Sequence, residues 1–578
     1  KGNIEIKDIN NNNYNFSEIY IDEKKKKIIG SDIKAFLNDS SFLINPENDP
    51  RFFANTFSSS NKINTFEKGI FTYCKNKAGE KCPPWALKSK KIKHDLAKKT
   101  IYYNNVVLKV YDFPIFFAPK FSHPDPTVKR RSGLLAPSLS NSTTIGSGIA
   151  VPYFWNIAND KDITFKPKFY GKDNPLLLAE YRQDFVNSFL IVDAGYTQGY
   201  KKKNNKKSGG GRAHFFSNFN INFFDEQNKK SNLNINVEKL SNDTYLKVYD
   251  VKGSLVEKDK VVLENKIDFV YQNNDFYFGL TPSAYEDTNK LENKRYEYLL
   301  PLNIEKSLMV SERYGFLNFG SDLRLRNYET NKRTDFLVNN FKWKSNKWLN
   351  SFGIENYFEG LVKNVNYQAK DTEEYKNEKN NYEVKSALGY FAKLGLYKED
   401  VINKNFHSLT PRFLLRYAPG HMRSIEGGKL NYGNLFNLKK TNELDIIEPG
   451  LSTSLGFEYK KNELDDGNTI GKDKYSLSIG QVISAKENMD IPSSSSLDQH
   501  FSDIVGESKY NLNNKFDLKY NFSIDQGYKS FNYNEVGADF ITENAKFNLS
   551  YLEEKQHIGS QEYLQTGIDF KPNNFTEL

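Results

Sequence analysis

Apolar and polar residues alternate with a period of two along most of this chain. Residues 515–524 read KFDLKYNFSI, and the pattern recurs in 218–223 (NFNINF), 232–238 (NLNINVE) and 546–551 (KFNLSY). Successive side chains of a β-strand point to opposite faces of the sheet, so each segment places its apolar side chains on one face. The opposite face is rich in Asn, Lys, Asp and Ser. The pattern predicts a large sheet with one apolar and one polar face.

A membrane barrel explains this pattern better than a soluble sheet does. From Arg131 onwards the chain has room for on the order of 20–24 strands of about 9–11 residues with their turns. A soluble sheet of that size splits or curls, whereas a closed barrel satisfies its backbone in lipid. Aromatic residues make up 15% of the chain, although hydrophobic residues reach only 38%. Membrane strands have this composition, because they are apolar on one face and carry aromatics at headgroup level.

Other features agree with strands as the membrane-crossing elements. No apolar run approaches the roughly 18 residues of a membrane helix. Asn273–Asn274 is typical of a tight hairpin, and 201–211 (KKKNNKKSGGG) of a long loop. We therefore expect short turns on one side of the sheet and longer loops on the other. The chain begins at Lys1 without a signal peptide, so we interpret it as a mature or trimmed product.

The chain before its proline-rich stretch differs from the rest. We expect short strands there, separated by polar turns, which form a small β-sandwich or jelly roll. Pro114, Pro119, Pro124 and Pro126 mark a junction, and we place the boundary near Phe121, between domains 1–120 and 121–578. The expected strands are Ile19–Ile21, Ile28–Ile29, Ile33–Leu37, Phe42–Ile44, Ile70–Tyr73, Trp85–Lys88, Ile101–Tyr103 and Val106–Val110. The predicted class is all-β: a front jelly roll followed by a large antiparallel transmembrane barrel.

Catalytic and metal-binding patterns do not emerge from the sequence. It has seven histidines but no HExxH, GxSxG, phosphate-cradling glycine loop or CxxC. His123, beside prolines, is interpreted as structural. Cys74 and Cys82 are too far apart for a redox pair; they form a small disulfide loop or remain free thiols. We therefore expect no enzyme, metal or cofactor.

The net charge of +9 is concentrated in part in the lysine runs 24–27 and 201–207. These runs are typical of solvated loops and turns. The basic residues form no stripe interleaved with aromatic residues, and no recognition motif accompanies them. A nucleic-acid partner is therefore not expected.

The junction carries the most specific pattern. Residues 121–140 read FSHPDPTVKRRSGLLAPSLS, 151–170 read VPYFWNIANDKDITFKPKFY and 176–185 read LLLAEYRQDF. These stretches resemble the LptD family of LPS-assembly proteins, whose barrel begins with an Arg–Arg–Ser–Gly stretch, two short strands and a Pro–x–x–Trp–Asn–Ile–Ala element. The matching residues are Arg130, Arg131, Ser132, Gly133, Pro152, Trp155, Asn156, Ile157 and Ala158. The resemblance extends to 45–56, 211–217, 409–420 and 478–497 and covers nearly the whole chain.

The resemblance implies that the protein transports lipopolysaccharide (LPS) into the outer leaflet of the outer membrane, with its front domain in the periplasm. It implies outer-membrane lipids, a plug lipoprotein of the LptE type and a periplasmic bridge protein of the LptA type as partners. The bridge protein would pair edge to edge with the jelly roll. The jelly-roll interior would shelter acyl chains from water; an ordinary sealed core is the alternative. The candidate groove residues are Ile33, Ala35, Leu37, Phe42, Ile44, Val106, Leu108 and Val110.

Pro137 and Pro152 fall in the first two expected barrel strands. Proline has no amide hydrogen, so each removes one ladder bond. Taken alone, each marks a strand end at the membrane interface. In the family, matching prolines loosen the pairing of the first and last strands, so the resemblance implies a lateral gate here. At the barrel entrance, Lys129, Arg130 and Arg131 either contact LPS phosphates or anchor the barrel mouth.

The chain departs from the family pattern at its end. It finishes NNFTEL, which is not an aromatic closing strand, and the family's carboxy-terminal cysteines are missing. We expect a barrel that lacks several C-terminal strands, in a chain truncated at both ends.

Three alternatives predict other features. A porin or receptor barrel for small solutes predicts a plug or constriction loop and no jelly roll. A soluble adhesive β-protein predicts regular repeats, and an outer-membrane lipase or protease predicts a nucleophile–histidine pair.

Overall fold

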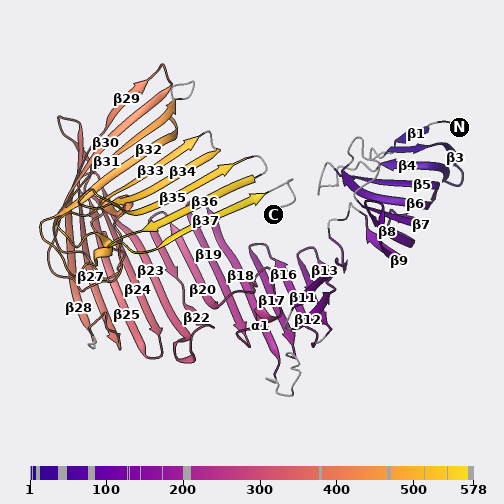
Figure 1. Ribbon diagram of the computed structural model, residues 1–578, viewed down its shortest axis with the longest axis horizontal. Helices are drawn as coiled ribbons and strands as arrows, with labels where there is room; N and C mark the ends of the chain where they lie inside the picture. Colours follow the sequence, from indigo (N-terminus) through magenta and orange to yellow (C-terminus); the bar gives the residue numbers. More distant parts are fainter. Residues whose placement is uncertain are drawn as a thin grey trace. The chain divides into compact units, whose positions relative to one another are not determined.

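The computed structural model describes residues 2, 4–7, 13–36, 48–60, 62–75, 85–125, 128, 130–142, 145–171, 173–198, 210–376, 380–464, 470–512, 515–542 and 545–570. They divide into two compact units: unit 1 is Lys1–Ala136 with Val151–Thr164, and unit 2 is Pro137–Ala150 with Phe165–Leu578. Almost all regular structure is β-strand (Figure 1), which confirms the predicted all-β class. Within the described ranges, no helix is long and apolar enough to cross a membrane.

Unit 1 contains one curled antiparallel sheet in which strands close in sequence pair, in the order β1-β2-β4-β5-β6-β7-β8-β9, with β3 against β4. A short pair, β10 and β13, follows it. The strands are β1 (Ile4–Lys7), β2 (Asn13–Phe16), β3 (Glu18–Asp22), β4 (Lys27–Phe36), β5 (Asn48–Ser60), β6 (Ile63–Lys75), β7 (Trp85–Asp95), β8 (Thr100–Val110), β9 (Phe113–Pro124), β10 (Gly133–Leu134), β13 (Tyr153–Ala158) and, at the unit boundary, β14 (Lys161–Phe165).

The inner face of this sheet closes over an aromatic core. Phe52 is fully buried and stacks on Phe66, with ring centroids 4.6 Å apart. Phe71 lies against Phe52 and against Tyr103 of β8. Aromatic pairs of this kind contribute about 0.5–1.5 kcal/mol beyond the burial of their area. The core therefore joins strands that are distant in sequence.

A row of residues outside the hydrogen-bonded ladder crosses this sheet. The register passes from Ser31↔Thr56 to Ile33↔Ala54 and from Lys91↔Asn104 to Ser89↔Val106, so that one residue on each strand is skipped. We call this the bend row; it consists of Asp32, Asn55, Lys68, Lys90, Asn105 and Pro119. Asp32, Lys68 and Asn105 have φ of 50°, 49° and 54°. Left-handed residues of this kind bend a strand and shift its alternation.

The bend row corrects two expectations. The predicted strands Ile101–Tyr103 and Val106–Val110 are one strand, β8, because Asn105 bends the strand without ending it. Tyr103 and Val106 therefore both face the core although they are three residues apart. The boundary predicted near Phe121 falls inside β9, which pairs with β8 as far as Pro124. Pro119 lies in the bend row, outside the hydrogen-bonded ladder, so its missing N–H removes no ladder bond.

Unit 2 is dominated by a strongly curved antiparallel sheet in which the strands from β16 to β37 follow one another in chain order. Three of these strands are interrupted, β21–β22, β25–β26 and β28–β29, because both members of each pair lie against the same neighbouring strand. Separately, β11 (Ser138–Ser142), β12 (Gly146–Ala150) and β15 (Lys168–Tyr170) form a small three-stranded sheet. Among the described residues, β37 pairs with β36 alone.

The strands of the curved sheet are β16 (Leu177–Asp184), β17 (Ser188–Thr197), β18 (Arg212–Glu226), β19 (Lys229–Leu240), β20 (Val262–Asn273), β21 (Phe276–Leu280), β22 (Ser283–Asp287), β23 (Tyr296–Ser311), β24 (Gly315–Tyr328), β25 (Lys332–Lys344), β26 (Trp348–Leu349), β27 (Ile354–Lys370), β28 (Asn381–Leu394), β29 (Leu396–Asp400), β30 (Asn405–Ala418), β31 (Gly450–Leu464), β32 (Ile470–Ser484), β33 (Ile504–Leu512), β34 (Phe516–Ile524), β35 (Phe531–Ile541), β36 (Ala545–Glu554) and β37 (Glu562–Phe570). The helices are α1 (Tyr245–Val248), α2 (Tyr432–Leu435) and the 3-10 turns Glu292–Lys294 and Ser493–Ser495.

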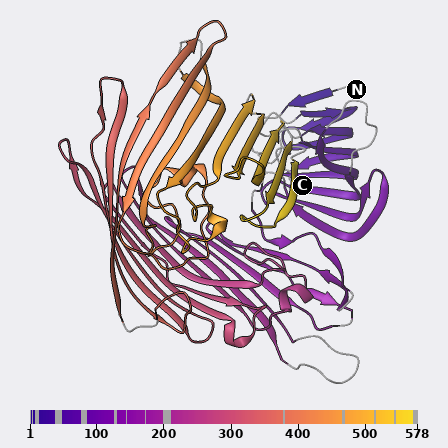
Figure 2. The same cartoon turned by 60° about the vertical axis from the view of Figure 1, so that its left-hand side comes forward.

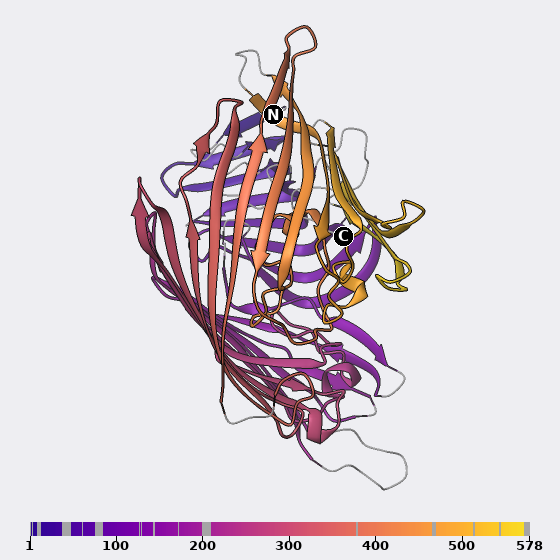
Figure 3. The same ribbon diagram turned by 90° about the vertical axis from the view of Figure 1, so that its left-hand side faces the viewer.

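The connections of unit 2 differ in length between the two ends of its strands. Tight turns such as 274–275 lie at one end; there the side-chain oxygen of Asn273 accepts from the amides of Asp275 and Phe276, as expected for a hairpin. The long connections 241–261, 419–449 and 485–503 lie at the other end. Residues 419–449 lie on the concave side of the sheet (Figures 2 and 3). The lysine-rich connection predicted at 201–211 lies outside the described residues up to position 209.

His123 of β9 is held in its neutral form. Its Nδ1 lies 2.7 Å from the carbonyl oxygen of Pro124, which can only accept, so Nδ1 donates. Its Nε2 therefore accepts from the hydroxyl of Tyr103, also at 2.7 Å. Burial lowers the pKa of His123 and raises that of Tyr103. Both shifts favour this neutral pair.

We predict that unit 1 loses stability as the pH falls. The unfolded histidine takes up a proton near pH 6.5, whereas the folded one resists protonation, so stability is fully present above about pH 6.5 and declines below it. His123→Gln cannot take up the proton and should flatten this part of the pH dependence. Hydrogen exchange of β8 and β9 at pH 7.5 and 5.5, corrected for intrinsic rates, measures it. His500→Gln, in unit 2, is the control, and an equally steep decline in H123Q would contradict the prediction.

Candidate functional site at the junction and on the concave face

The two prolines of the predicted gate stand just outside strands. Pro137 immediately precedes β11 in unit 2, and Pro152 immediately precedes β13 in unit 1. The expectation that they lie within strands is therefore wrong by one residue each. Pro152 is buried, and its carbonyl oxygen accepts from the amide of Leu135 at 2.9 Å. Each proline thus marks a strand end, where its missing N–H is tolerated.

The strands beside these prolines form unusually short ladders. β10 has two residues, which pair as Gly133↔Phe154 and Leu134↔Tyr153, whereas β23 has 16 residues. In unit 2, β11 and β12 have five residues each and β15 has three. Fewer backbone hydrogen bonds hold these strands than hold the long strands of the curved sheet. In each unit, the strands beside these prolines are therefore weakly paired.

The two arginines of the junction have specific partners within unit 1. Arg130 forms an ion pair with Asp162 of β14 and donates to the carbonyl of Asn159 at 2.8 Å. Arg131 donates to the hydroxyl of Thr100 and to the carbonyls of the adjacent turn between β7 and β8, 3.3–3.4 Å away. These contacts favour the anchoring interpretation of both residues. Lys129 lies outside the described residues.

The groove candidates occupy different environments. Ile33, Ala35 and Val106 are 1–2% exposed and belong to the sealed aromatic core. Leu108 is half-buried at the margin of that core, and Val110 is exposed. Leu37, Phe42 and Ile44 lie outside the described residues, as does Cys82; for Cys74 only the backbone is described. In this structure a lipid cannot reach Ile33, Ala35 or Val106 without displacing core side chains.

Exposed apolar side chains of unit 1 gather on β9, which sequence reasoning missed. Phe113, Ile115, Phe116 and Phe117 are 55–72% exposed. β9 pairs with β8 alone among the described residues, so its other backbone edge is open. The signal in the sequence is the run FPIFFAPKF at 113–121, where apolar residues occupy consecutive positions and both faces are therefore apolar. We call these four residues the β9 apolar patch.

The faces of the curved sheet differ as the alternation predicted. On β30, Phe413, Leu415 and Tyr417 share one face, and Leu415 and Tyr417 are 41% and 56% exposed. Arg412, Leu414, Arg416 and Ala418 share the other, where Leu414 and Ala418 contact residues 419–449. On β30 the concave face thus carries two arginines and an apolar area where the connection between β30 and β31 packs; a second apolar cluster lies on this face of β25 and β27.

That connection, residues 419–449, is named the packed segment. Its side chains Leu430, Leu435, Ile446 and Ile447 are buried in one cluster with residues of β27, β28, β30, β32 and β33. α2 begins in a capping box formed by Asn431 and Asn434. Lysines on two strands hold the segment: Lys363 donates to the carbonyl of Leu444 at 2.7 Å and Lys385 to that of Asp445 at 2.9 Å.

A buried charge pair closes the base of the packed segment. Arg416 lies 3.4 Å from the Glu448 carboxylate and also donates to the carbonyl of Leu438 at 2.5 Å. The same carboxylate accepts from the backbone amides of Lys440 and Thr441 at 3.1 and 2.5 Å. Both charged side chains are almost fully buried. An ion pair this deep is stable only with such additional hydrogen bonds.

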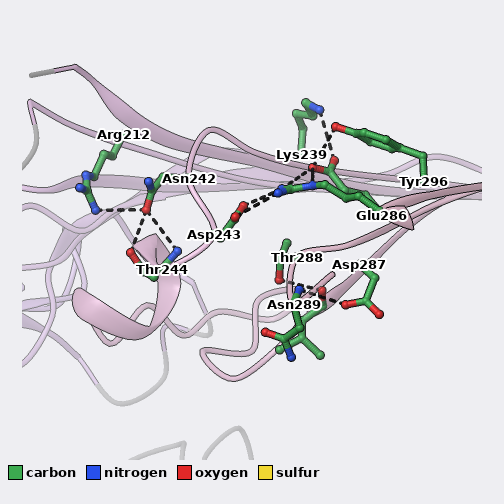
Figure 4. A network of polar contacts seen from close by, with 12 residues as sticks. Arg212, Lys239, Asn242, Asp243, Thr244, Glu286, Asp287, Thr288, Asn289 and Tyr296 are labelled. Carbon is green, nitrogen blue, oxygen red and sulfur yellow. Dashed lines mark hydrogen bonds and ion pairs between the residues drawn. The ribbon is translucent and has the colours of Figure 1, made fainter. Parts of the chain in front are cut away.

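The connection 241–261 is also fastened to the sheet, by a polar network at the ends of the strands (Figure 4). The guanidinium of Arg295 bridges Asp243 and Glu286, with shortest contacts of 2.6 Å to each. Asn242 links Arg212 at 3.1 Å to Thr244. Nearby, buried His214 lies 2.9 Å from Asp193 and 3.2 Å from the hydroxyl of Tyr245. The connection 241–261 is thus held by this network at its surface and by the buried contact of Tyr245 with His214.

Asp503, Asp525 and His557 bring potential metal-ligand atoms within 4.8 Å of one another. The carboxylate of Asp503 already accepts from Ser523 at 2.7 Å and Asn532 at 3.1 Å, and lies 3.2 Å from His557. These bonds satisfy the buried carboxylate without an ion. We interpret the cluster as a link between neighbouring turns.

Removal of the charge on Glu448 should release the packed segment. Breaking one side of a buried pair destabilises by about 3–5 kcal/mol, so Glu448→Gln is expected to speed tryptic cleavage at Lys429 and Lys439 strongly in the folded chain. Glu443→Gln is the matched control, since its partner Arg423 is 3.0 Å away in a more exposed pair, worth about 0–1 kcal/mol. Equal cleavage rates in the two variants would refute this role.

Comparisons with known proteins place these features in a family. The family model described as LptD, LPS transport system D, matches residues 214–576. LPS-assembly protein LptD of Nitrosococcus oceani is 26% identical over 197 residues, 33% of this chain and 24% of that protein. Its counterpart in Pseudomonas aeruginosa is 32% identical over 138 residues, 24% of this chain and 14% of that protein. The LptD protein of Shewanella sp. strain ANA-3 is 37% identical over 105 residues, which are 18% of this chain and 14% of that protein.

These matches span at most a quarter of the length of the three relatives. The family model, in contrast, covers more than half of this chain, nearly the whole curved sheet with the packed segment. It confirms the resemblance that the junction residues indicated. The chain belongs to the LptD family.

Proposed function

We propose that this chain delivers LPS to the outer leaflet of the outer membrane. The observation that carries the proposal is a curved sheet, apolar on one face and polar on its concave face, in a chain that belongs to the LptD family. The apolar face suits contact with lipid, and the polar face suits a hydrated lumen. In this proposal unit 2 contributes the wall of an outer-membrane barrel and unit 1 lies in the periplasm.

Unit 1 would receive the acyl chains of LPS. The β9 apolar patch is the largest group of neighbouring exposed apolar side chains that we identify on the described strands of this unit. Covering such a patch with acyl chains gains about 25 cal/mol per Å² of apolar surface removed from water. The half-buried Leu108 and exposed Val110 continue the patch onto β8. An open strand edge also permits edge-to-edge pairing with a bridge protein of the LptA type.

The short ladders at the junction would serve as the lateral gate. LPS has acyl chains that prefer the bilayer and a charged saccharide that does not. Opening between weakly paired strands lets the acyl chains enter the membrane sideways while the saccharide follows the polar concave face. Pro137 and Pro152 support this by ending the ladders of β11 and β13. Arg130 and Arg131 act as anchors of the junction, and a lipoprotein of the LptE type would complete the lumen.

The main alternative, a general porin, predicts a plug or constriction loop. The packed segment on the concave face of β27 to β33 agrees with that part of the alternative. The same alternative predicts no separate β-domain ahead of the barrel, whereas unit 1 forms its own antiparallel sheet. Unit 1 therefore supports LPS delivery over a general porin.

Photocrosslinking in cells tests the proposal. A photoreactive residue at Ile115, Phe117 or Pro137 is expected to form LPS adducts, because these positions lie on the proposed path. Lys91, an exposed position on β7, is the control without an apolar patch. Normal insertion of the chain without adducts at any of the three positions would overturn the proposal and favour a generic barrel.

A further inference from the structure

A cavity of about 510 Å³ lies between the curved sheet and the packed segment. Its wall is formed by residues of β24, β25 and β27, and its cover by Asn437, Leu438, Lys439 and Leu444. Small-molecule sites have volumes of roughly 300–1,000 Å³, and a water molecule takes about 30 Å³. The cavity therefore has room for a ligand larger than an inorganic anion.

The charges around this cavity favour an anion. Lys342, Lys363 and Lys439 line it, and none of the three forms an ion pair with a carboxylate among the described residues. Lys344 is neutralised by Glu359 at 2.7 Å. The remaining carboxylate, Asp322, is engaged by the side-chain amides of Asn303 at 2.5 Å and Asn340 at 3.1 Å. The lining thus has a surplus of positive charge.

One group in the lining lacks a partner. Asn340 is 7% exposed, and its amide nitrogen donates to Asp322 while its Oδ1 accepts no hydrogen bond. A buried acceptor left unsatisfied costs about 1–3 kcal/mol. A hydroxyl donor on a ligand would remove this cost. Asn318 and Asn437 supply further amides, and Leu361 and Leu438 supply apolar surface for the C–H groups of a sugar ring.

We propose that this cavity binds a phosphorylated saccharide, with Lys342 and Lys439 on the phosphate and Asn340 on a sugar hydroxyl. Ammonium groups bind phosphate through charge-assisted hydrogen bonds, and amides and hydroxyls pair in both directions. The identification of the saccharide as the LPS head group rests on the proposed function; the chemistry of the site does not. The cavity would then be a station for the head group on the concave face.

Titration calorimetry of the full chain in detergent tests this site. The probe is a β-1,6-linked glucosamine disaccharide with two phosphates and no acyl chains; the references are the same sugar without phosphate and inorganic phosphate. We expect the probe to bind at least about tenfold more tightly than either reference, with an affinity that falls with salt. Equal affinity for inorganic phosphate, or for the unphosphorylated sugar, would overturn the assignment.

Variants locate the binding. Lys342→Gln with Lys439→Gln removes the two proposed phosphate ligands and should weaken binding of the probe at least about tenfold. Asn340→Asp replaces the acceptor amide with a second carboxylate beside Asp322 and should weaken it similarly. Asn339→Asp is the matched control, because Asn339 bonds Ser321 and Asn364 on the opposite face. Unchanged affinity in the lysine variant, or an equal loss in N339D, would place the binding elsewhere and overturn the inference.

The outcomes separate this site from the proposed function. If the probe binds, and its affinity depends on Lys342 and Lys439, while crosslinking yields no LPS adducts, the binding site is supported and LPS delivery is refuted. If adducts form but the probe does not bind, LPS delivery stands and this cavity is not its station.

Discussion

The hydrogen-bonded ladder between neighbouring strands is the constraint on which the rest of this structure depends. A chain that turns an apolar face towards lipid cannot leave backbone N–H and C=O groups unpaired, because no water is present to satisfy them. The long strand pairs of unit 2 meet this demand from β16 onwards. The ladder is short or open at several places, and these include the junction and β9. We locate lipid handling at these places for that reason.

The concave face shows how a polar surface can hold a folded connection. Apolar side chains of the packed segment need an apolar area on the strands, and Leu361, Phe391 and Leu414 provide it. Around it, charges are placed where backbone carbonyls or carboxylates meet them, as at Lys385 and Arg416. Such contacts fix one arrangement of the segment. The cavity lies where the segment passes over β24, β25 and β27.

The sequence predicted the fold class, the alternating faces and the junction from local patterns. Residues 515–524 are an example: their period of two predicts which side chains share a face, and residues 516–524 do pair as a strand. Three features escaped this reasoning. Asn104–Asn105 has the composition of a turn, but pairing on both sides of β8 holds it within a strand. The β9 apolar patch has no alternation.

The packed segment escaped for another reason: it has no periodicity at all, because partners far away in the sequence define its structure. Glu448 shows what sequence patterns cannot predict. Nothing nearby in the sequence indicates burial, and its position follows from Arg416 on the preceding strand and from the amides of Lys440 and Thr441. Of the candidate site, the prolines and arginines were found by motif, whereas the cavity required the folded sheet.

In unit 1 the residues that bend the sheet differ from the residues that fill its interior. The line along which the sheet folds over is set by backbone conformation at Asp32, Lys68 and Asn105, none of which is an apolar core residue. Core side chains can therefore be exchanged for others of similar volume without moving the crease. Under the proposed function, relatives that receive acyl chains of different length and number could vary this interior and retain the same open edge. The bend row would thus keep the shape of the sheet constant among relatives whose core side chains differ.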